Sequence, residues 1–198
     1  MRKPNFFIIG ASKAGTTSLW HMVGKHPDVF MCEPKEPKFF TPEEADFYTY
    51  RDGARGWSWY RRLFEEVEQQ SIVGDASTNY HRVADFPHVP ELLYEHFPDS
   101  KLLYSVRHPL ERMKSVYIQC LSTGHRMPRR FDEAVRTHSP FVEGCKYWKN
   151  INAFRQNFSD DQIHVVVFED LITDTAAALE TIFRFLSVDP AEYESSLE

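Results

Sequence analysis

The chain of 198 residues has the length of one ordinary folded domain, and its 42% hydrophobic and 15% aromatic residues exclude a disordered chain. A formal net charge of -6 argues against general affinity for nucleic acid or for anionic membranes, so an anion site requires a local basic cluster. No apolar run approaches the length of a membrane span. The three widely spaced cysteines form neither a metal motif nor a disulfide framework, which favours a reducing, cytoplasmic setting.

The first predicted elements are a strand over residues 6–9, a loop of small residues, and a helix from about Thr16 to Gly24. The strand is apolar without alternation, which is typical of a strand buried on both faces of a parallel sheet. The loop that begins at Gly10 reads G-x-x-x-x-G-T-T. Its glycines let the backbone approach an anion closely, and the N–H groups at the helix start point toward that anion. The pattern therefore predicts a phosphate-binding loop.

This loop differs from the nucleoside-triphosphate loop at one decisive position. The triphosphate loop requires a lysine directly after its second glycine and then a Ser or Thr that holds magnesium. Here Thr16 follows Gly15, and the lysine, Lys13, lies inside the loop. We therefore expect a phosphate-like anion that is held without a metal. The alternative is a glycine-rich turn with an ordinary surface lysine, because short glycine motifs recur by chance.

After a predicted short strand over residues 29–31, charges alternate with prolines in the segment KEPKFF. Pro34 and Pro37 keep the backbone extended, and Phe39 and Phe40 can anchor it to the core. Charged loops between prolines are usually solvated, but a stiff and anchored backbone favours a fixed array of side chains. The charged side chains of this array are Lys35, Glu36 and Lys38.

Residues 48–55 read as a polar, aromatic loop, and a helix is expected from there to about residue 67. Its core-facing side chains are Trp57, Tyr60, Phe64 and Val67. Residues 71–77 predict a second buried strand, which ends in polar residues that include Asp75 and Ser77. Because the carboxyl ends of parallel strands meet at one edge, these residues should lie beside the phosphate loop.

The second half of the chain alternates further strands and helices. Buried strands are expected over 101–106 and 163–168, and helices over 89–97, from Pro109, and over 131–137, 147–158 and 175–186. The first of these strands delivers Arg107 to the ligand edge, and Ser115 follows two helical turns later. A guanidinium fork and a hydroxyl suit a phosphate, although Arg107 taken alone would as readily be a salt-bridged surface residue. The basic segment 124–130 is either a guide for an acidic acceptor or, more commonly, a solvated loop.

Strands that alternate with helices predict an α/β fold, which we interpret as a P-loop-like three-layer arrangement with a mainly parallel central sheet flanked by helices. The ligand is expected at the carboxyl edge of this sheet.

Ordered along the chain, four segments resemble the sulfotransferases that use 3′-phosphoadenosine 5′-phosphosulfate (PAPS). The segments are GASKAGTT, KEPKFF, GDASTNY and YSVRHPLERMKSVY. The KE-x-x-FF and GW-x-WY elements look like those of the heparan-sulfate-type branch and its bacterial relatives. The resemblance implies transfer of a sulfuryl group, without a metal, to a hydroxyl or an amine of a glycan or small metabolite.

The resemblance also implies a role for each candidate residue. The 5′-phosphosulfate would bind Lys13, Ala14, Gly15, Thr16, Thr17 and Ser18, and the 3′-phosphate would bind Arg107 and Ser115. Glu36 would act as the general base on the acceptor, while Lys13 would stabilise the charge of the leaving group. The acceptor site would include Lys35, Lys38 and Ser77.

Two other functions stay open from the sequence. A P-loop nucleotide kinase or related phosphotransferase would need magnesium and a lysine after Gly15. A catalytically silent nucleotide-binding domain is the other. Members of the family normally continue into a C-terminal segment that closes over the 3′-phosphate, whereas this chain ends at Glu198. We therefore expect a single domain over residues 1–198 that lacks this segment, with weaker donor binding.

Overall fold

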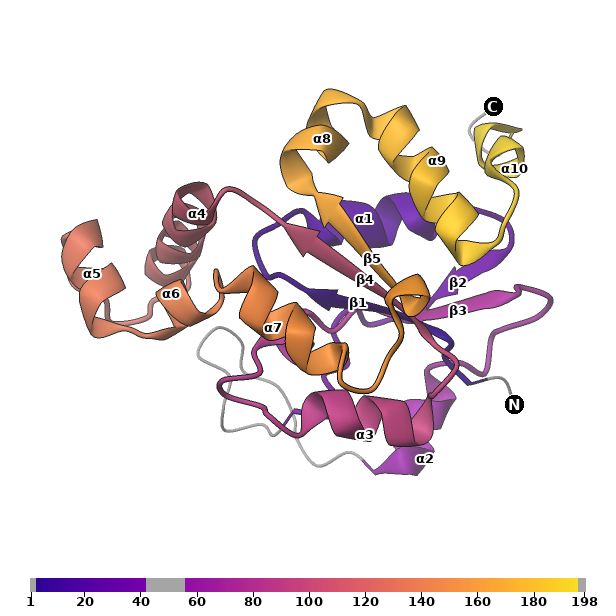
Figure 1. Cartoon of the computed structure of the whole chain (residues 1–198), viewed down its shortest axis with the longest axis horizontal. Coiled ribbons are helices and arrows are strands. Elements are labelled where there is room, and N and C mark those ends of the chain that lie inside the picture. The colour runs from indigo at the N-terminus through magenta and orange to yellow at the C-terminus, as the bar shows by residue number, and fades with distance from the viewer. Residues whose placement is uncertain (1–2, 42–55, 196–198) are drawn as a thin grey trace.

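A computed structural model describes residues 3–41 and 56–195, in which strands alternate with helices around a central sheet (Figure 1). The strands are β1 (Phe6–Gly10), β2 (Val29–Met31), β3 (Ile72–Asp75), β4 (Lys101–Val106) and β5 (Ile163–Val167). They form a sheet in the order β2-β3-β1-β4-β5, and every described pair of neighbours is parallel. The predicted P-loop-like α/β fold is confirmed.

Helices cover both faces of the sheet and extend beyond its carboxyl edge (Figure 1). One face carries α1 (Thr16–Val23), α8 (Phe168–Thr173) and α9 (Thr175–Leu186), with α10 (Pro190–Ser195) beside α9. The other face carries α2 (Trp57–Arg62), α3 (Val89–His96) and α7 (Tyr147–Phe154). Beyond the end of β4 lie α4 (Pro109–Ser122), α5 (Phe131–Thr137) and α6 (Pro140–Glu143). Two short 3₁₀ turns, η2 (Thr78–His81) and η3 (Asp160–Gln162), complete the described elements.

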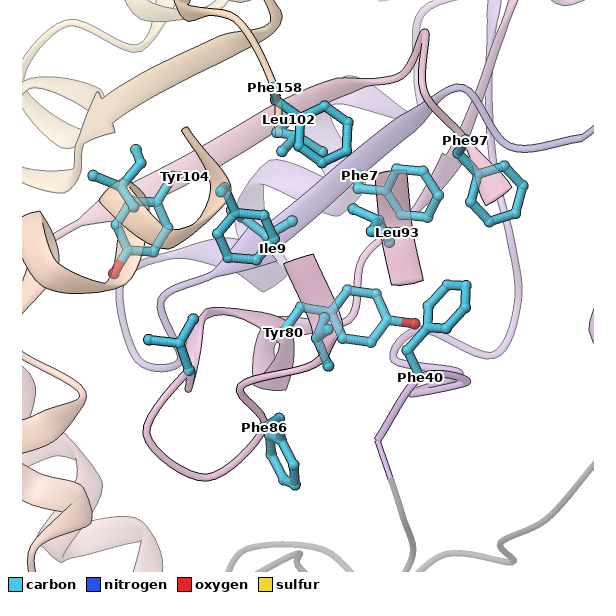
Figure 2. Packing of buried hydrophobic residues seen from close by; sticks show 14 of the residues in the cluster. Phe7, Ile9, Phe40, Tyr80, Phe86, Leu93, Phe97, Leu102, Tyr104 and Phe158 are labelled. Carbon is cyan, nitrogen blue, oxygen red and sulfur yellow. The ribbon is translucent and has the colours of Figure 1, made fainter. Parts of the chain in front are cut away.

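Successive residues of β1 point to opposite faces of the sheet and so divide the core into two layers. Phe6 and Ile8 pack with the α1 and α9 side. Phe7 and Ile9 pack on the other face, in an aromatic-rich cluster that also includes Leu102 of β4 (Figure 2). Because all of β1 is buried, its apolar run shows no alternation, which explains why the sequence predicted it well.

The strand over 101–106 and the helices over 131–137 and 175–186 are confirmed. The helix expected to continue to residue 67 ends at Arg62, although Tyr60 and Phe64 are buried in the core as predicted. The helix expected over 147–158 ends at Phe154, because the chain turns at the polar residues that follow it. The loop predicted over 48–55 lies outside the described residues.

The prediction of a buried strand over residues 163–168 was wrong. In the described sheet β5 is an edge strand, where Val165 and Val167 are 46% and 40% exposed. A short apolar run does not distinguish an edge strand from a central one. Phe168, which was assigned to this strand, instead begins α8. Within the described residues, no helix combines the length and the apolar character that a membrane crossing requires.

Candidate active site

A pocket of about 500 Å³ opens at the carboxyl edge of the sheet. It is lined by the loop after β1, by the KEPKFF segment, by the start of η2, by Arg107 at the end of β4 and by the middle of α4. All of the predicted site residues except Ala14 and Ser77 line it: Lys13, Gly15, Thr16, Thr17, Ser18, Lys35, Glu36, Lys38, Arg107 and Ser115. Residues that are up to about half the chain apart in sequence are thus gathered around one space.

The loop between β1 and α1 forms one wall of this pocket. Gly15 is the N-cap of α1 with a φ of 79°, and no described side chain caps the helix. The first-turn N–H groups of α1 therefore remain available to a ligand, and the helix dipole favours an anion there. Gly15 is required for a second reason, since a Cβ atom at this position would lie 2.5 Å from the ring of Phe168. The geometry is that of an anion-binding loop.

Arg107 lies at the end of β4, beside the loop. Its Nη1 atom donates to the carbonyl oxygen of Lys13 at 3.2 Å, and its guanidinium lies 4.7 Å from the ring centroid of Phe168. Arg107 forms no ion pair with a described carboxylate and lines the pocket, so it is not the salt-bridged surface arginine of the alternative interpretation. Its remaining donors and its charge are available to an anion in the pocket.

Glu36 lies in the wall of the pocket that the KEPKFF segment forms, and it is held by three neighbours. Its Oε1 atom accepts from Lys35 Nζ at 2.7 Å and from Thr78 Oγ1 at 2.9 Å, and Lys38 Nζ lies 3.5 Å from Oε2. Burial alone would raise the pKa of Glu36, but the charges of Lys35 and Lys38 and the hydrogen bonds from Lys35 and Thr78 outweigh it and hold the pKa below its ordinary value. The carboxylate is therefore ionised at neutral pH.

The backbone of this wall is strained and needs support. Glu36 and Lys38 have φ angles of 60° and 54°, in the left-handed region that costs a residue with a side chain about 1–2 kcal/mol. The N–H of Lys38 donates to Ser77 Oγ at 2.9 Å, and Ser77 Oγ donates to Asp75 Oδ1 at 2.6 Å. Ser77 is fully buried beneath the loop, so the structure places it as a support of Lys38 and away from the pocket surface where the acceptor was expected.

Asp75 connects this support to the aromatic residues of the loop. Its Oδ2 atom accepts from Tyr60 Oη at 2.7 Å and from Tyr80 Oη at 3.3 Å. The Tyr60 ring stacks on Phe39 with centroids 4.3 Å apart, and Tyr80 packs against Phe40, as the proximity of their rings in Figure 2 shows. The two phenylalanines of KEPKFF are thus anchored on two tyrosines that share one buried carboxylate.

Comparison with known proteins agrees with this architecture. The family model described as "Sulfotransferase family" matches residues 4–192. The chain belongs to the sulfotransferase family. Among solved structures, a sulfotransferase from Alicyclobacillus acidocaldarius is 29% identical with a TM-score of 0.80, over 96% of this chain and 83% of that one. A mouse sulfotransferase solved with PAP has a TM-score of 0.64 at 15% identity, over 99% of this chain and 63% of that one, and shows the shared fold.

Curated sulfotransferases also match. Mouse heparan sulfate glucosamine 3-O-sulfotransferase 5 is 29% identical over 198 residues, which is 94% of this chain and 54% of that protein. The chain therefore spans about half the length of this relative. The resemblance to the PAPS sulfotransferases inferred from the sequence is confirmed, and nothing favours the kinase alternative, since Thr16 stands where its lysine would be.

Some residues of this candidate site were not found from the sequence. Thr78, which donates to Glu36, lies inside the GDASTNY motif that marked the strand end, so that motif contained the signal. Phe168, which packs on Gly15 and Arg107, gave no signal because its segment read as strand. Ala14 was expected at the ligand but is fully buried. Among the described residues, no group of three or more His, Cys, Asp and Glu side chains is arranged to hold a metal ion.

The buried carboxylate predicts a pH dependence of stability. Burial raises the pKa of Asp75 from 3.8 to about 6, although hydrogen bonds from Ser77, Tyr60 and Tyr80 act the other way. The folded protein then binds this proton more tightly than the unfolded chain, so ionisation of Asp75 costs stability above pH 6 and not below pH 4, at about 1.4 kcal/mol for each pKa unit.

We expect the free energy of unfolding of the wild type, minus that of Asp75→Asn, to fall by up to about 3 kcal/mol as the pH rises from about 4 to about 7. Other carboxylates cancel in this difference because both proteins contain them. Urea unfolding across this pH range measures it, and a difference that stays constant with pH would contradict the assignment.

Proposed function

We propose that the protein transfers a sulfuryl group from PAPS to a hydroxyl, or less readily an amine, of a glycan or small-molecule acceptor. The observation that carries this proposal is that Glu36 and the anion loop with Lys13 line the same pocket. A proton acceptor therefore shares one pocket with a site for a phosphate-like donor. The PAP-bound mouse relative supports the choice of donor, and the name of the heparan sulfate relatives supports a glycan hydroxyl among the acceptors.

On this proposal the donor binds along the wall formed by α1 and α4. The first-turn amides of α1 and the Lys13 ammonium bind the 5′-phosphosulfate, and Arg107 and Ser115 bind the 3′-phosphate. All of these groups line the pocket. Arg107 is pre-oriented by its stacking on Phe168 and its hydrogen bond to the Lys13 carbonyl oxygen, so little side-chain freedom remains to be lost on binding.

The reaction then consists of one displacement at sulfur. The acceptor oxygen forms a bond to sulfur while the bond from sulfur to the phosphate oxygen breaks, and PAP leaves with the electron pair. Glu36 takes the acceptor proton, and Lys13 stabilises the charge that develops on the leaving phosphate oxygen. Alignment and charge stabilisation supply most of the rate, as in phosphoryl transfer.

The low pKa of Glu36 makes it a weak base in the free protein. An acceptor that displaces water from the pocket would desolvate the carboxylate further and raise its pKa toward the value that proton transfer needs. Lys35 and Lys38 also give this side of the pocket positive charge, which suits an acceptor with an anionic group.

Turnover tests the proposal directly. The protein is incubated with PAPS and a panel of glycan and small hydroxyl acceptors, and PAP release is measured with and without each acceptor. Acceptor-dependent PAP release that equals the amount of sulfated product supports the proposal. Absence of transfer to every acceptor class, in a protein that still binds PAP, would support a silent nucleotide-binding domain.

A cytoplasmic location stays a prediction from cysteine usage.

The support under Lys38 yields a further prediction for this activity. Ser77→Ala removes the acceptor of the Lys38 N–H, so the strained loop should sample other conformations. We expect kcat to fall about fivefold, since one net hydrogen bond is worth about 1 kcal/mol. The Kd for PAP should stay within about twofold, because the anion loop is untouched. Steady-state kinetics and calorimetry measure the two effects. Equal losses in both quantities would show that Ser77 supports the whole fold and not this loop.

A further inference from the structure

Three consecutive carbonyl oxygens of the anion loop are each bound by a side chain of the segment from β4 to α4. Arg112 Nε donates to Ser12 O at 3.0 Å, and Arg107 Nη1 donates to Lys13 O at 3.2 Å. Ser105 Oγ donates to Ala14 O at 2.5 Å. Ser105 and Arg112 are buried and do not line the pocket, so they act on the loop from behind.

Arg112 binds the loop from a buried position, and burial of its charge costs free energy. Its side chain is 1% exposed, and it forms no ion pair with a described carboxylate. Its other donors bind Ser12 Oγ at 3.1 Å and Phe141 O at 3.4 Å. Gly144 leaves room for the guanidinium, since a Cβ there would lie 2.4 Å from Nη2. With Cys145 Sγ as a further acceptor at 3.4 Å, this buried cation is bound by two peptide oxygens, a hydroxyl and a thiol, and it adds a positive charge directly beneath the loop.

The direction of these carbonyl groups fixes the direction of the amides. In a planar trans peptide the C=O of one residue and the N–H of the next point opposite ways. The Ala14 N–H closes the loop internally on Ala11 O at 3.1 Å. The N–H groups of Lys13 and Gly15 have no acceptor among the described residues, and both of these residues line the pocket while Ala14 does not.

We propose that Ser105 and Arg112 are positioning residues that hold the loop carbonyl groups away from the pocket and so preset the Lys13 and Gly15 amides for a terminal phosphate or sulfate anion. This inference rests on the proposed function for the identity of that anion, the phosphosulfate of the donor. Without the two residues, the loop can turn a carbonyl oxygen toward the anion, which repels it. Binding then has to reorder the loop, at a cost in affinity.

The chain offers a matched pair of serines for the test. Ser100 directly precedes β4 and Ser105 lies near the end of the same strand, and both are buried. Each donates one hydroxyl hydrogen bond to a carbonyl oxygen, Ser105 to Ala14 O and Ser100 to Phe97 O at 2.8 Å. Ser105→Ala and Ser100→Ala should lower Tm by similar amounts. Only Ser105→Ala should raise the Kd for PAP, by about tenfold, when measured by calorimetry. Arg112→Lys, which keeps the charge but loses the fork, should raise it as well.

Equal Kd values for PAP in wild type, Ser105→Ala and Arg112→Lys would overturn the inference. A second measurement does not depend on the nucleotide. The ¹⁵N order parameters of residues 12–15 should fall in Ser105→Ala and stay at wild-type values in Ser100→Ala. If wild type binds no PAP, the proposed function fails, and the order parameters alone then decide the inference. Unchanged order parameters in Ser105→Ala would refute it.

Discussion

Glu36→Gln should reduce sulfuryl transfer by about a hundredfold to ten-thousandfold, the usual contribution of a positioned general base, and should leave PAP binding intact. The glutamine keeps the size of the side chain and can still accept from Lys35 and Thr78, but it cannot take a proton from the acceptor. Removal of a negative charge from the pocket favours the anionic nucleotide slightly, so the Kd for PAP should stay the same or decrease. Steady-state rates with a saturating acceptor, together with calorimetry, measure both effects.

Glu33→Gln is the matched control for this change. Glu33 lies three residues earlier in the same segment, is exposed and does not line the pocket. The same chemical substitution there should leave kcat within about twofold of wild type, since isolated surface charges contribute little. If Glu36→Gln lost no more activity than Glu33→Gln, the proton would go elsewhere and Glu36 would not be the base.

The second large effect is expected at the donor site. Lys13→Met keeps most of the side-chain stem and removes the ammonium that we place on the phosphosulfate. A charge-assisted hydrogen bond is worth about 1.5–3 kcal/mol, so the Kd for PAP should rise by about 10- to 150-fold. The rate of transfer at saturating PAPS should fall further, because Lys13 also stabilises the leaving group. Lys13 has a φ of 68°, but methionine carries the same backbone cost as lysine, so strain does not confuse the comparison.

Lys25→Met is the corresponding control. Lys25 is exposed just past the far end of α1 and does not line the pocket. The substitution therefore removes the same charge from a nearby part of the chain without changing the pocket. Its Kd for PAP should change by less than about twofold at physiological salt, where screening limits distant charges. Equal losses in the two variants would mean that Lys13 acts only through net charge and not at the anion.

The parts of the site that were predictable are those encoded by neighbouring residues. The strand, glycine loop and helix from Phe6 to Val23 follow from an apolar run and two glycines that are local in sequence. The position of Arg107 follows from its place directly after a strand. In both cases the topology of a parallel sheet brings separate segments to one edge, so the sequence pattern is sufficient.

The parts that were not predictable depend on contacts between distant segments. Nothing local indicates that Tyr60 would donate to Asp75, or that Ser77 would turn inward to hold the Lys38 amide. The left-handed backbone at Glu36 carries no glycine to mark it. Likewise, the exposure of β5 depends on its position at the end of the strand order, which an apolar run does not reveal.

The central claim is that this pocket binds the product nucleotide of PAPS through its own side chains and amides. Calorimetric titration of the wild-type protein with PAP in the presence of EDTA, compared with ATP and magnesium, tests it most directly. We expect saturable PAP binding at one site without a metal, weakened by both Lys13→Met and Arg107→Ala, and no comparable binding of ATP. Binding of ATP with magnesium and none of PAP would contradict it.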